Sequence, residues 1–286
     1  ARSIPICHTI HDLHPHVGAF YGRFLYLWNR SVRNSVDQIL VHGERYRDEM
    51  LAQGIAPSRV TYTPLMHLFL SYEQDRRMLQ SPPSIRYEPW ALFFARLEVY
   101  KGLPVLIEAA KQIAPAMQAS PSVILAGKGR LEKLGMGLIP PSVEVRNRLI
   151  GDLEAIDLFG RCGLVALPYI EASQSALIAA AYYFSKPVIV TRTGALPEYV
   201  VQGQTGWVIP PNDPQALADR LGTALGDPDR LAQMGRAGRE WYERQRQIEE
   251  ENLQHMYAEL ADGAQQPAHG SVASTISTQS SGRAEV

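Results

Sequence analysis

The sequence contains few cysteines, no long apolar run and no excess of charge of one sign. Its 286 residues include only Cys7 and Cys162, each beside an apolar strand-like run and without a partner at metal-ligand spacing. This usage argues against a disulfide scaffold or a metal site and is typical of buried, reduced thiols in a cytosolic protein. No stretch approaches the roughly 18 apolar residues that indicate a membrane-spanning helix.

The charge balance restricts the classes of partner. Lys and Arg number 28 and Asp and Glu number 29, for a formal net charge of -1. No basic stripe or recognisable motif favours nucleic acid as a partner, so any anionic ligand has to be held by local groups. With 45% hydrophobic residues, the chain has the composition and length of about two globular domains.

Two common nucleotide-binding signals are not supported by the sequence. The one DxD sequence, Asp227-Pro228-Asp229, stands at the start of a predicted helix and does not follow a strand, so it does not indicate the usual carboxylate pair for a divalent metal on a sugar nucleotide. The segment AGKG at 126–129 follows an apolar run, but a dinucleotide fingerprint needs a third glycine where Glu132 stands. This argues against a Rossmann dehydrogenase. By itself AGKG fits an ordinary strand-to-helix turn as well as a ligand-binding loop.

The apolar patterns predict an α/β protein, because short continuous runs alternate with longer helical periods, as in βαβ units around a buried parallel sheet. Residues 1–80 predict a first domain, with strands at 4–10, 38–41 and 59–63 and helices at 21–36 and 44–53. Residues 81–262 predict a second domain, with strands at 91–94, 122–126, 164–168, 187–191 and 206–210, and helices after Lys101, over 174–184, after Pro214 and from Asp227 onward.

Two segments show little periodicity. Residues 71–89 are rich in Pro, Ser and Tyr and are predicted to connect the two domains. Residues 263–286 are polar, small and unpatterned, which predicts a disordered tail. The charged stretch up to about Leu260 favours helix, and whether it returns to the first domain is left open.

A pair of cations marks the first candidate site. Arg96 and Lys101 follow the strand at 91–94 and precede a helix, which is where open parallel sheets bind ligands. Such a pair suits a diphosphate, because each charge-assisted hydrogen bond contributes roughly 1.5 to 3 kcal/mol. A solvated pair at the edge of a loop is the alternative interpretation.

The second candidate site is PYIEASQS at 168–175, a loop between a buried strand and an apolar helix. We predict that the helix begins near Gln174 with Ser173 as its N-cap, so that free N–H groups and Ser175 favour an anion. Glu171 would accept hydrogen bonds from sugar hydroxyls. The alternative is that Glu171 is a solvated loop acid and that Ser173 only caps the helix.

Taken in order, RLEVYKG (96–102), AGKG, NRLIGDLEAIDLF (147–159), PYIEASQS and KPVIVTRTGALPEYVVQGQTGWVIPPNDP (186–214) resemble the retaining glycosyltransferases of family 4, also called group 1. The resemblance implies a GT-B architecture, with a complete Rossmann-like C-terminal domain and a partial Rossmann-like N-terminal domain. It implies that Arg96 and Lys101 bind the donor diphosphate together with residues 173–175. Gly127 and Lys128 would lie near the nucleotide, and Leu149 and Ile150 against its base.

The resemblance also implies catalytic groups and partners. HTIHDLHPHVG at 8–18 is similar to the family's His-Asp element, in which His11 would face the donor sugar, as would Glu171. The implied reaction moves a sugar with retention from a nucleoside-diphosphate sugar to a glycan or lipid-linked acceptor. It needs no resident cofactor and no metal. A cytoplasmic location with peripheral contact to the inner membrane, and a role in polysaccharide synthesis, are implied in the same way.

The sequence departs from the family pattern in two ways. Where the family has a second Glu eight residues after Glu171, this chain has Ala179. The first domain is short, and we interpret the chain as N-terminally incomplete. A non-catalytic nucleotide-sugar-binding module therefore stays open as an alternative function. A nucleotide-sugar 2-epimerase of the same architecture is a second alternative, and product analysis would distinguish it.

Overall fold

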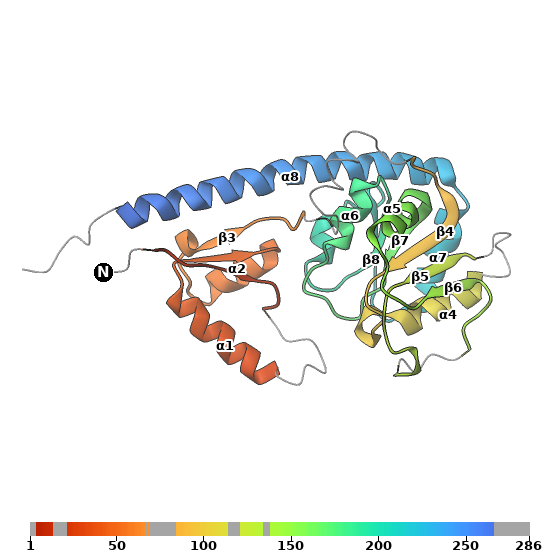
Figure 1. Cartoon of the computed structure of the whole chain (residues 1–286), viewed down its shortest axis with the longest axis horizontal. Helices are drawn as coiled ribbons and strands as arrows, with labels where there is room; N and C mark the ends of the chain where they lie inside the picture. The colour runs from red at the N-terminus through yellow and green to blue at the C-terminus, as the bar shows by residue number, and fades with distance from the viewer. Residues whose placement is uncertain are drawn as a thin grey trace, which may run out of the picture.

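The computed structural model describes residues 4–13, 22–66, 68, 84–113, 121–133 and 138–265. Most of the predicted connection and all but the first residues of the predicted tail lie outside these segments. The described chain forms two lobes, each built on a parallel sheet, with one long helix running along both (Figure 1).

The smaller lobe contains three parallel strands in the order β1-β2-β3. The predicted strands and helices are all found, with slightly different ends. They are β1 (Cys7–Ile10), β2 (Gln38–Val41), β3 (Val60–Tyr62), α1 (Gly22–Ser35), α2 (Glu44–Ala52) and the short 3-10 helix η1 (Pro57–Arg59). The run QILV is buried along its whole length, as expected for the central strand of a parallel sheet.

The larger lobe contains six parallel strands in the order β6-β5-β4-β7-β8-β9. These are β4 (Glu88–Phe94), β5 (Val123–Ala126), β6 (Val143–Arg146), β7 (Cys162–Leu167), β8 (Val188–Thr191) and β9 (Gly206–Ile209). The helices are α4 (Leu103–Ile113), α5 (Asp152–Arg161), α6 (Leu177–Tyr183) and α7 (Pro214–Leu225), with 3-10 helices η2 (Val99–Lys101), η3 (Leu131–Lys133) and η4 (Leu196–Tyr199).

One strand of this sheet is absent from the sequence prediction. β6 has the sequence VEVR, and only Val143 is buried, whereas Glu144 and Arg146 form an ion pair at 2.6 Å. Because β6 pairs only with β5, it is an edge strand and can carry charged side chains. Its alternating pattern is too short to stand out beside the continuous apolar runs of the other strands.

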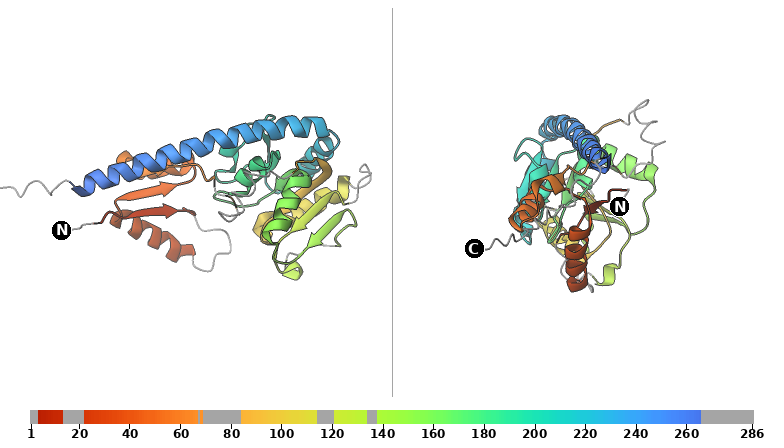
Figure 2. Two further views of the ribbon diagram at one scale, coloured as in Figure 1. Left: turned by 45° about the horizontal axis from the view of Figure 1, so that its top comes forward. Right: turned by 90° about the vertical axis from the view of Figure 1, so that its left-hand side faces the viewer.

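The C-terminal segment forms a single helix, α8 (Pro228–Gln265), of 38 residues. Figures 1 and 2 show it packed along the larger lobe first and then along the smaller one. In the smaller lobe, the Asn252 side chain donates to the carbonyl of Tyr62 at 3.0 Å, and Glu249 accepts from the Met66 N–H at 3.2 Å. The helix therefore makes specific polar contacts with the lobe that lies earliest in the chain.

Candidate active site

The C-terminal ends of β4 and β7 define the centre of the candidate site. β4 pairs with β5 on one side and with β7 on the other. The strands β5 and β6 therefore extend the sheet to one side of β4, and β7, β8 and β9 extend it to the other. Parallel sheets bind ligands at this kind of switch point, because the loops leave in opposite directions. The loop after β4 carries Arg96 and Lys101, and the loop after β7 carries Glu171 and Ser173.

Close backbone contacts tie these two loops together. The Ile170 N–H donates to the Tyr100 carbonyl at 2.8 Å. Gly102 has a φ of 73°, and a Cβ atom there would lie 1.8 Å from the Pro168 carbonyl oxygen. Only glycine fits this position, since it tolerates both the left-handed backbone and the contact. The position of Lys101 is thus fixed relative to residues 168–171.

The side chain of Lys101 lies against two tyrosine rings of the site. Its Nζ atom is 3.8 Å from the centre of the Tyr169 ring and 5.1 Å from that of Tyr100, which are cation–π distances. Burial, and after it the positive charge of Arg96, lower the pKa of Lys101 to about 8, while Glu98 and Asp12 act in the opposite direction. A desolvated cation of this kind gains a partner when an anion binds.

Arg96 is more exposed and is held by its own loop. Its guanidinium forms an ion pair with Glu98 at 2.9 Å and donates to the Tyr100 hydroxyl at 3.0 Å, while 72% of the side chain is exposed. Binding a phosphate would require this side chain to exchange Glu98 for the ligand. The structure thus places both predicted cations at the switch point, Lys101 largely buried and Arg96 exposed.

The loop after β7 differs from the prediction. α6 begins at Leu177, three residues later than Gln174, and its N-cap is Ala176, so the prediction that Ser173 caps the helix is wrong. The reason is tertiary: the Ser173 carbonyl accepts from the Ala195 N–H at 2.8 Å and from the Tyr46 hydroxyl at 3.1 Å, which holds residues 173–176 out of the helix. Ser173 and Ser175 are both buried, whereas Glu171 and Gln174 are partly exposed.

The predicted nucleotide side lies at the ends of β5 and β6. The Asn147 side chain accepts from the Gly129 N–H at 2.9 Å and joins the AGKG turn to the next loop. Lys128 is exposed, and Gly127 packs against β4, since a Cβ atom there would meet the Ala95 carbonyl oxygen at 1.8 Å. Asn147 is an anchoring residue that the sequence analysis did not single out.

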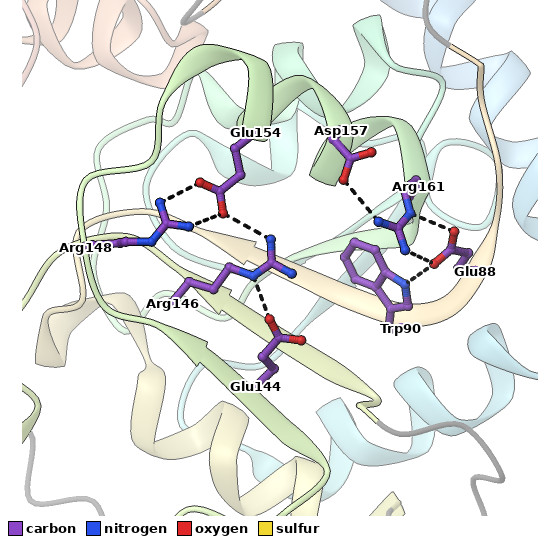
Figure 3. Close-up of polar contacts among 8 residues, drawn as sticks. All are labelled: Glu88, Trp90, Glu144, Arg146, Arg148, Glu154, Asp157 and Arg161. Atoms are coloured by element: carbon purple, nitrogen blue, oxygen red, sulfur yellow. Dashed lines mark hydrogen bonds and ion pairs between the residues drawn. The ribbon is translucent and has the colours of Figure 1, made fainter.

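Leu149 and Ile150 are presented by a charge cluster that the sequence analysis also missed. Arg148 makes two hydrogen bonds with Glu154, at 2.6 and 2.7 Å, and Arg146 adds a third at 3.1 Å (Figure 3). These bonds fix the loop to the first turn of α5. Leu149 is 78% exposed and Ile150 is half-buried, so the loop offers an apolar surface to the solvent. In the sequence, the signal that could have indicated this cluster is the spacing of the two arginines before a glutamate in the first turn of the helix.

A second polar cluster joins the start of β4 to the end of α5. Arg161 holds Glu88 through two hydrogen bonds, and the Trp90 indole donates to the same carboxylate at 3.0 Å (Figure 3). A cavity of about 340 Å³ opens here, lined in part by Arg146 and Glu144. The cavity extends from Glu88 at the start of β4 to Arg146 at the end of β6, beside Leu158 and Arg161 of α5, and we do not assign it to the site.

The smaller lobe contributes the end of β1. His11 is exposed, with its ring centre 5.3 Å from that of His42, and the neighbouring Asp12 is close enough to Lys101 to act on its pKa. The Tyr199 hydroxyl donates to the His42 carbonyl at 2.5 Å and accepts from the Leu65 N–H at 3.0 Å. Of the predicted His-Asp element, Asp12 therefore lies near Lys101 across the junction of the two lobes.

Other chemistry finds little support among the described residues. No group of three His, Cys, Asp or Glu side chains in those segments is placed to hold a metal ion. Cys162 is fully buried, and burial raises the pKa of its thiol to about 12, which keeps it protonated and unreactive. Within the same segments, no helix is both long and apolar enough to cross a membrane.

The fold of the chain is that of the GT-B glycosyltransferases. The structure of Anabaena Alr3699/HepE in complex with UDP superposes with a TM-score of 0.66 at 18% identity, over 89% of this chain and 72% of that one. Staphylococcus aureus TarM, solved with UDP, gives a TM-score of 0.68 at 16% identity, over 90% of this chain and 50% of its own. The predicted α/β fold of GT-B type is confirmed.

The family follows from the sequence of the larger lobe. Residues 88–227 match the family "Glycosyl transferases group 1". The chain is 27% identical over 239 residues to a GDP-mannose-dependent alpha-(1-6)-phosphatidylinositol monomannoside mannosyltransferase of Mycolicibacterium smegmatis, and 29% identical over 182 residues to a D-inositol 3-phosphate glycosyltransferase of Corynebacterium glutamicum. Residues 88–227 are therefore a group 1 glycosyltransferase domain, as the motifs predicted.

The relatives are longer than the region they share with this chain. The alignments cover 74% and 57% of this chain, but only 59% of the mannosyltransferase and 40% of the inositol phosphate glycosyltransferase. The family match includes the two loops that carry Arg96, Lys101 and Glu171, since these lie within residues 88–227.

Proposed function

We propose that this chain binds a nucleoside-diphosphate sugar and transfers the sugar, with retention of anomeric configuration, to a glycan or lipid-linked acceptor. The observation that carries the proposal is the position of Lys101, a desolvated cation packed on Tyr169 at the switch point. A diphosphate between Lys101, Arg96 and the loop at 168–175 satisfies these cations. The names of the curated relatives, both glycosyltransferases, support the same class of reaction.

The proposed chemistry rests on stabilising the leaving group. As the glycosidic bond breaks, negative charge develops on the nucleoside diphosphate, and preorganised cations lower the barrier by stabilising that charge. Lys101 and Arg96 do this, with Ser175 beside them. Glu171 and His11 orient the hydroxyls of the transferred sugar from opposite lobes. The leaving phosphate oxygen accepts the proton of the acceptor hydroxyl, so no separate general base is required.

We expect the affinity for a nucleoside diphosphate to fall as the pH rises. Because the pKa of Lys101 is about 8 without ligand, the ammonium loses its proton above that pH, and the anion must then restore it. Affinity should fall by up to about tenfold per pH unit above about pH 8, where the ligand's phosphates, with a second pKa of about 6, are already ionised. Calorimetric titration across this range measures the slope.

The matched variant for this titration is Lys101→Arg. Arginine stays protonated throughout the range, so its affinity should be nearly independent of pH. If the wild-type protein shows no slope, or if Lys101→Arg shows the same slope, Lys101 is not the group that binds the phosphate.

Reaction products distinguish transfer from binding alone. With a suitable donor and acceptor, we expect a free nucleotide and a glycoside of retained configuration, detected by NMR of the anomeric proton. A metal chelator should leave the rate unchanged, because the cations of the site are side chains. An inverted product contradicts the proposed stereochemistry, and loss of activity with chelator contradicts the proposed role of the cations.

One structural feature favours a non-catalytic nucleotide-sugar-binding module as a second candidate. Ala179 lies in α6 and is fully buried, so this position presents a methyl group where the family pattern has a carboxylate. That function predicts nucleotide binding without release of sugar or formation of a glycoside. The same product analysis decides between the two candidates.

A further inference from the structure

The first turn of α2 lacks a cap of its own. Its N-cap residue is Gly43, which has no side chain to accept the free N–H groups. Glu198, in η4 of the larger lobe, provides the missing acceptors: its carboxylate accepts from the Glu44 N–H at 2.7 Å and from the Arg45 N–H at 3.3 Å. A negative charge is also favourable at this end of a helix dipole. One lobe thus caps a helix of the other.

The same turn of α2 reaches the loop that follows β7. The hydroxyl of Tyr46 donates to the Ser173 carbonyl at 3.1 Å, and both residues are buried, at 8% and 6% exposed. Arg45 donates to the Gly194 carbonyl at 2.7 Å. Glu44, Arg45 and Tyr46 of α2 are therefore hydrogen-bonded to the larger lobe. The first two contact η4 or the preceding Gly194, and Tyr46 contacts the loop after β7.

The segments at this contact are packed closely against one another. A Cβ atom on Gly43 would lie 2.7 Å from the Cβ of Ala195, and one on Gly194 would lie 1.8 Å from the Ala172 carbonyl oxygen. The Ala195 N–H also donates to the Ser173 carbonyl. A shift of α2 away from the larger lobe breaks the bonds of Glu198 and Tyr46 together, and it removes one of the two donors to Ser173.

We propose that Glu198 and Tyr46 form a latch that couples the conformation of the loop at 170–176 to the position of α2. We call these two residues, with the groups they bond on α2 and at Ser173, the α2 latch. In this arrangement, approach of the lobes and ordering of the loop are a single event. Tyr46 acts as a positioning residue, because it reaches the ligand loop only through the Ser173 carbonyl. The coupling needs no ligand, and its link to a nucleotide rests on the proposed function.

Amide hydrogen exchange without ligand tests the coupling. In Glu198→Gln the charge that caps α2 is lost, so exchange should rise at residues 44–47. We expect it to rise as well, by roughly fivefold, in peptides covering residues 170–176 and 193–196, which is about the effect of losing one hydrogen bond. Tyr46→Phe should give the same rise in the loop. Peptides covering β5 serve as an internal reference for the stability of the whole fold.

Matched controls separate the latch from general effects of substitution. Tyr257→Phe removes a hydroxyl from a tyrosine that is 60% exposed on α8, and Glu250→Gln removes an exposed carboxylate from the same helix. Neither should alter exchange in the loop. If Glu198→Gln raises exchange at residues 44–47 alone, or if Tyr46→Phe leaves the loop unchanged, the cap is only structural and the latch is refuted.

A second arm of the experiment adds UDP and GDP in turn. Protection of residues 170–176 by either nucleotide in the wild-type protein supports the proposed function, and protection that extends to residues 44–47 supports the coupling. Protection confined to the loop contradicts the latch but leaves the proposed function standing. A raised ligand-free exchange in both variants with no protection by either nucleotide supports the latch and counts against nucleotide binding.

Discussion

Lys101→Ala should weaken the binding of a nucleoside diphosphate by roughly 10- to 100-fold, the effect of removing a charge-assisted hydrogen bond of about 1.5 to 3 kcal/mol. Arg96→Ala should have a smaller effect, because Arg96 is exposed and already bonded to Glu98 and Tyr100. Calorimetric titration with UDP, GDP, ADP and TDP measures both variants and identifies the preferred base. Lys111→Ala is the matched control, since Lys111 lies on α4 and forms an ion pair with Glu108.

The same variant separates a binding role from a structural one. Burial costs the Lys101 ammonium hydration, so replacing it should leave the ligand-free protein as stable as the wild type or more stable. Thermal unfolding without ligand checks this. A loss of stability together with unchanged affinity would make Lys101 a structural residue and remove the main support for the proposed function.

Gly102→Ala should destabilise the larger lobe by about 2 to 5 kcal/mol, the sum of a left-handed backbone penalty of about 1 to 2 and an overpacking cost of about 1 to 3. The added Cβ atom would lie 1.8 Å from the Pro168 carbonyl oxygen, a backbone atom that can move only with its loop. We expect a lower unfolding temperature and, in protein that remains folded, a large loss of nucleotide affinity, because the loops after β4 and β7 are pushed apart.

Gly54→Ala is the control for the backbone term. Gly54 has a φ of 85°, similar to that of Gly102, but no atom lies within 4 Å of its added Cβ. It should therefore cost only about 1 to 2 kcal/mol and leave nucleotide affinity unchanged. Equal destabilisation by the two variants would show that the contact with Pro168 is not tight in solution.

The structure corrects the sequence reading at the start of α6. The run QSALIAAAYYF has helical character throughout, and a Ser before it is a common N-cap. The helix nevertheless begins at Leu177, because Ser173 is bonded through its carbonyl to Ala195 and Tyr46, which are distant in the sequence. Local propensity cannot include hydrogen bonds to segments 22 and 127 residues away.

The charged features show the same division. Arg96 and Lys101 stand out in the sequence because they follow a buried strand. The sequence does not show that Lys101 packs on the Tyr169 ring, away from water, while Arg96 is exposed. Asn147 and Glu198 could not be found, since single polar residues are common in loops and first turns. Their roles depend on partners brought close by the fold.

The sequence by itself determined the parallel α/β architecture, the order of the ligand loops and the family of the larger lobe. These properties depend on local periodicity and on motifs that stay in one order along the chain. Only the tertiary structure decided where α6 starts, which cation is sequestered, and that Glu198 caps α2 from the other lobe. The physical reason is that burial and hydrogen-bond partners are set by residues far apart in the chain.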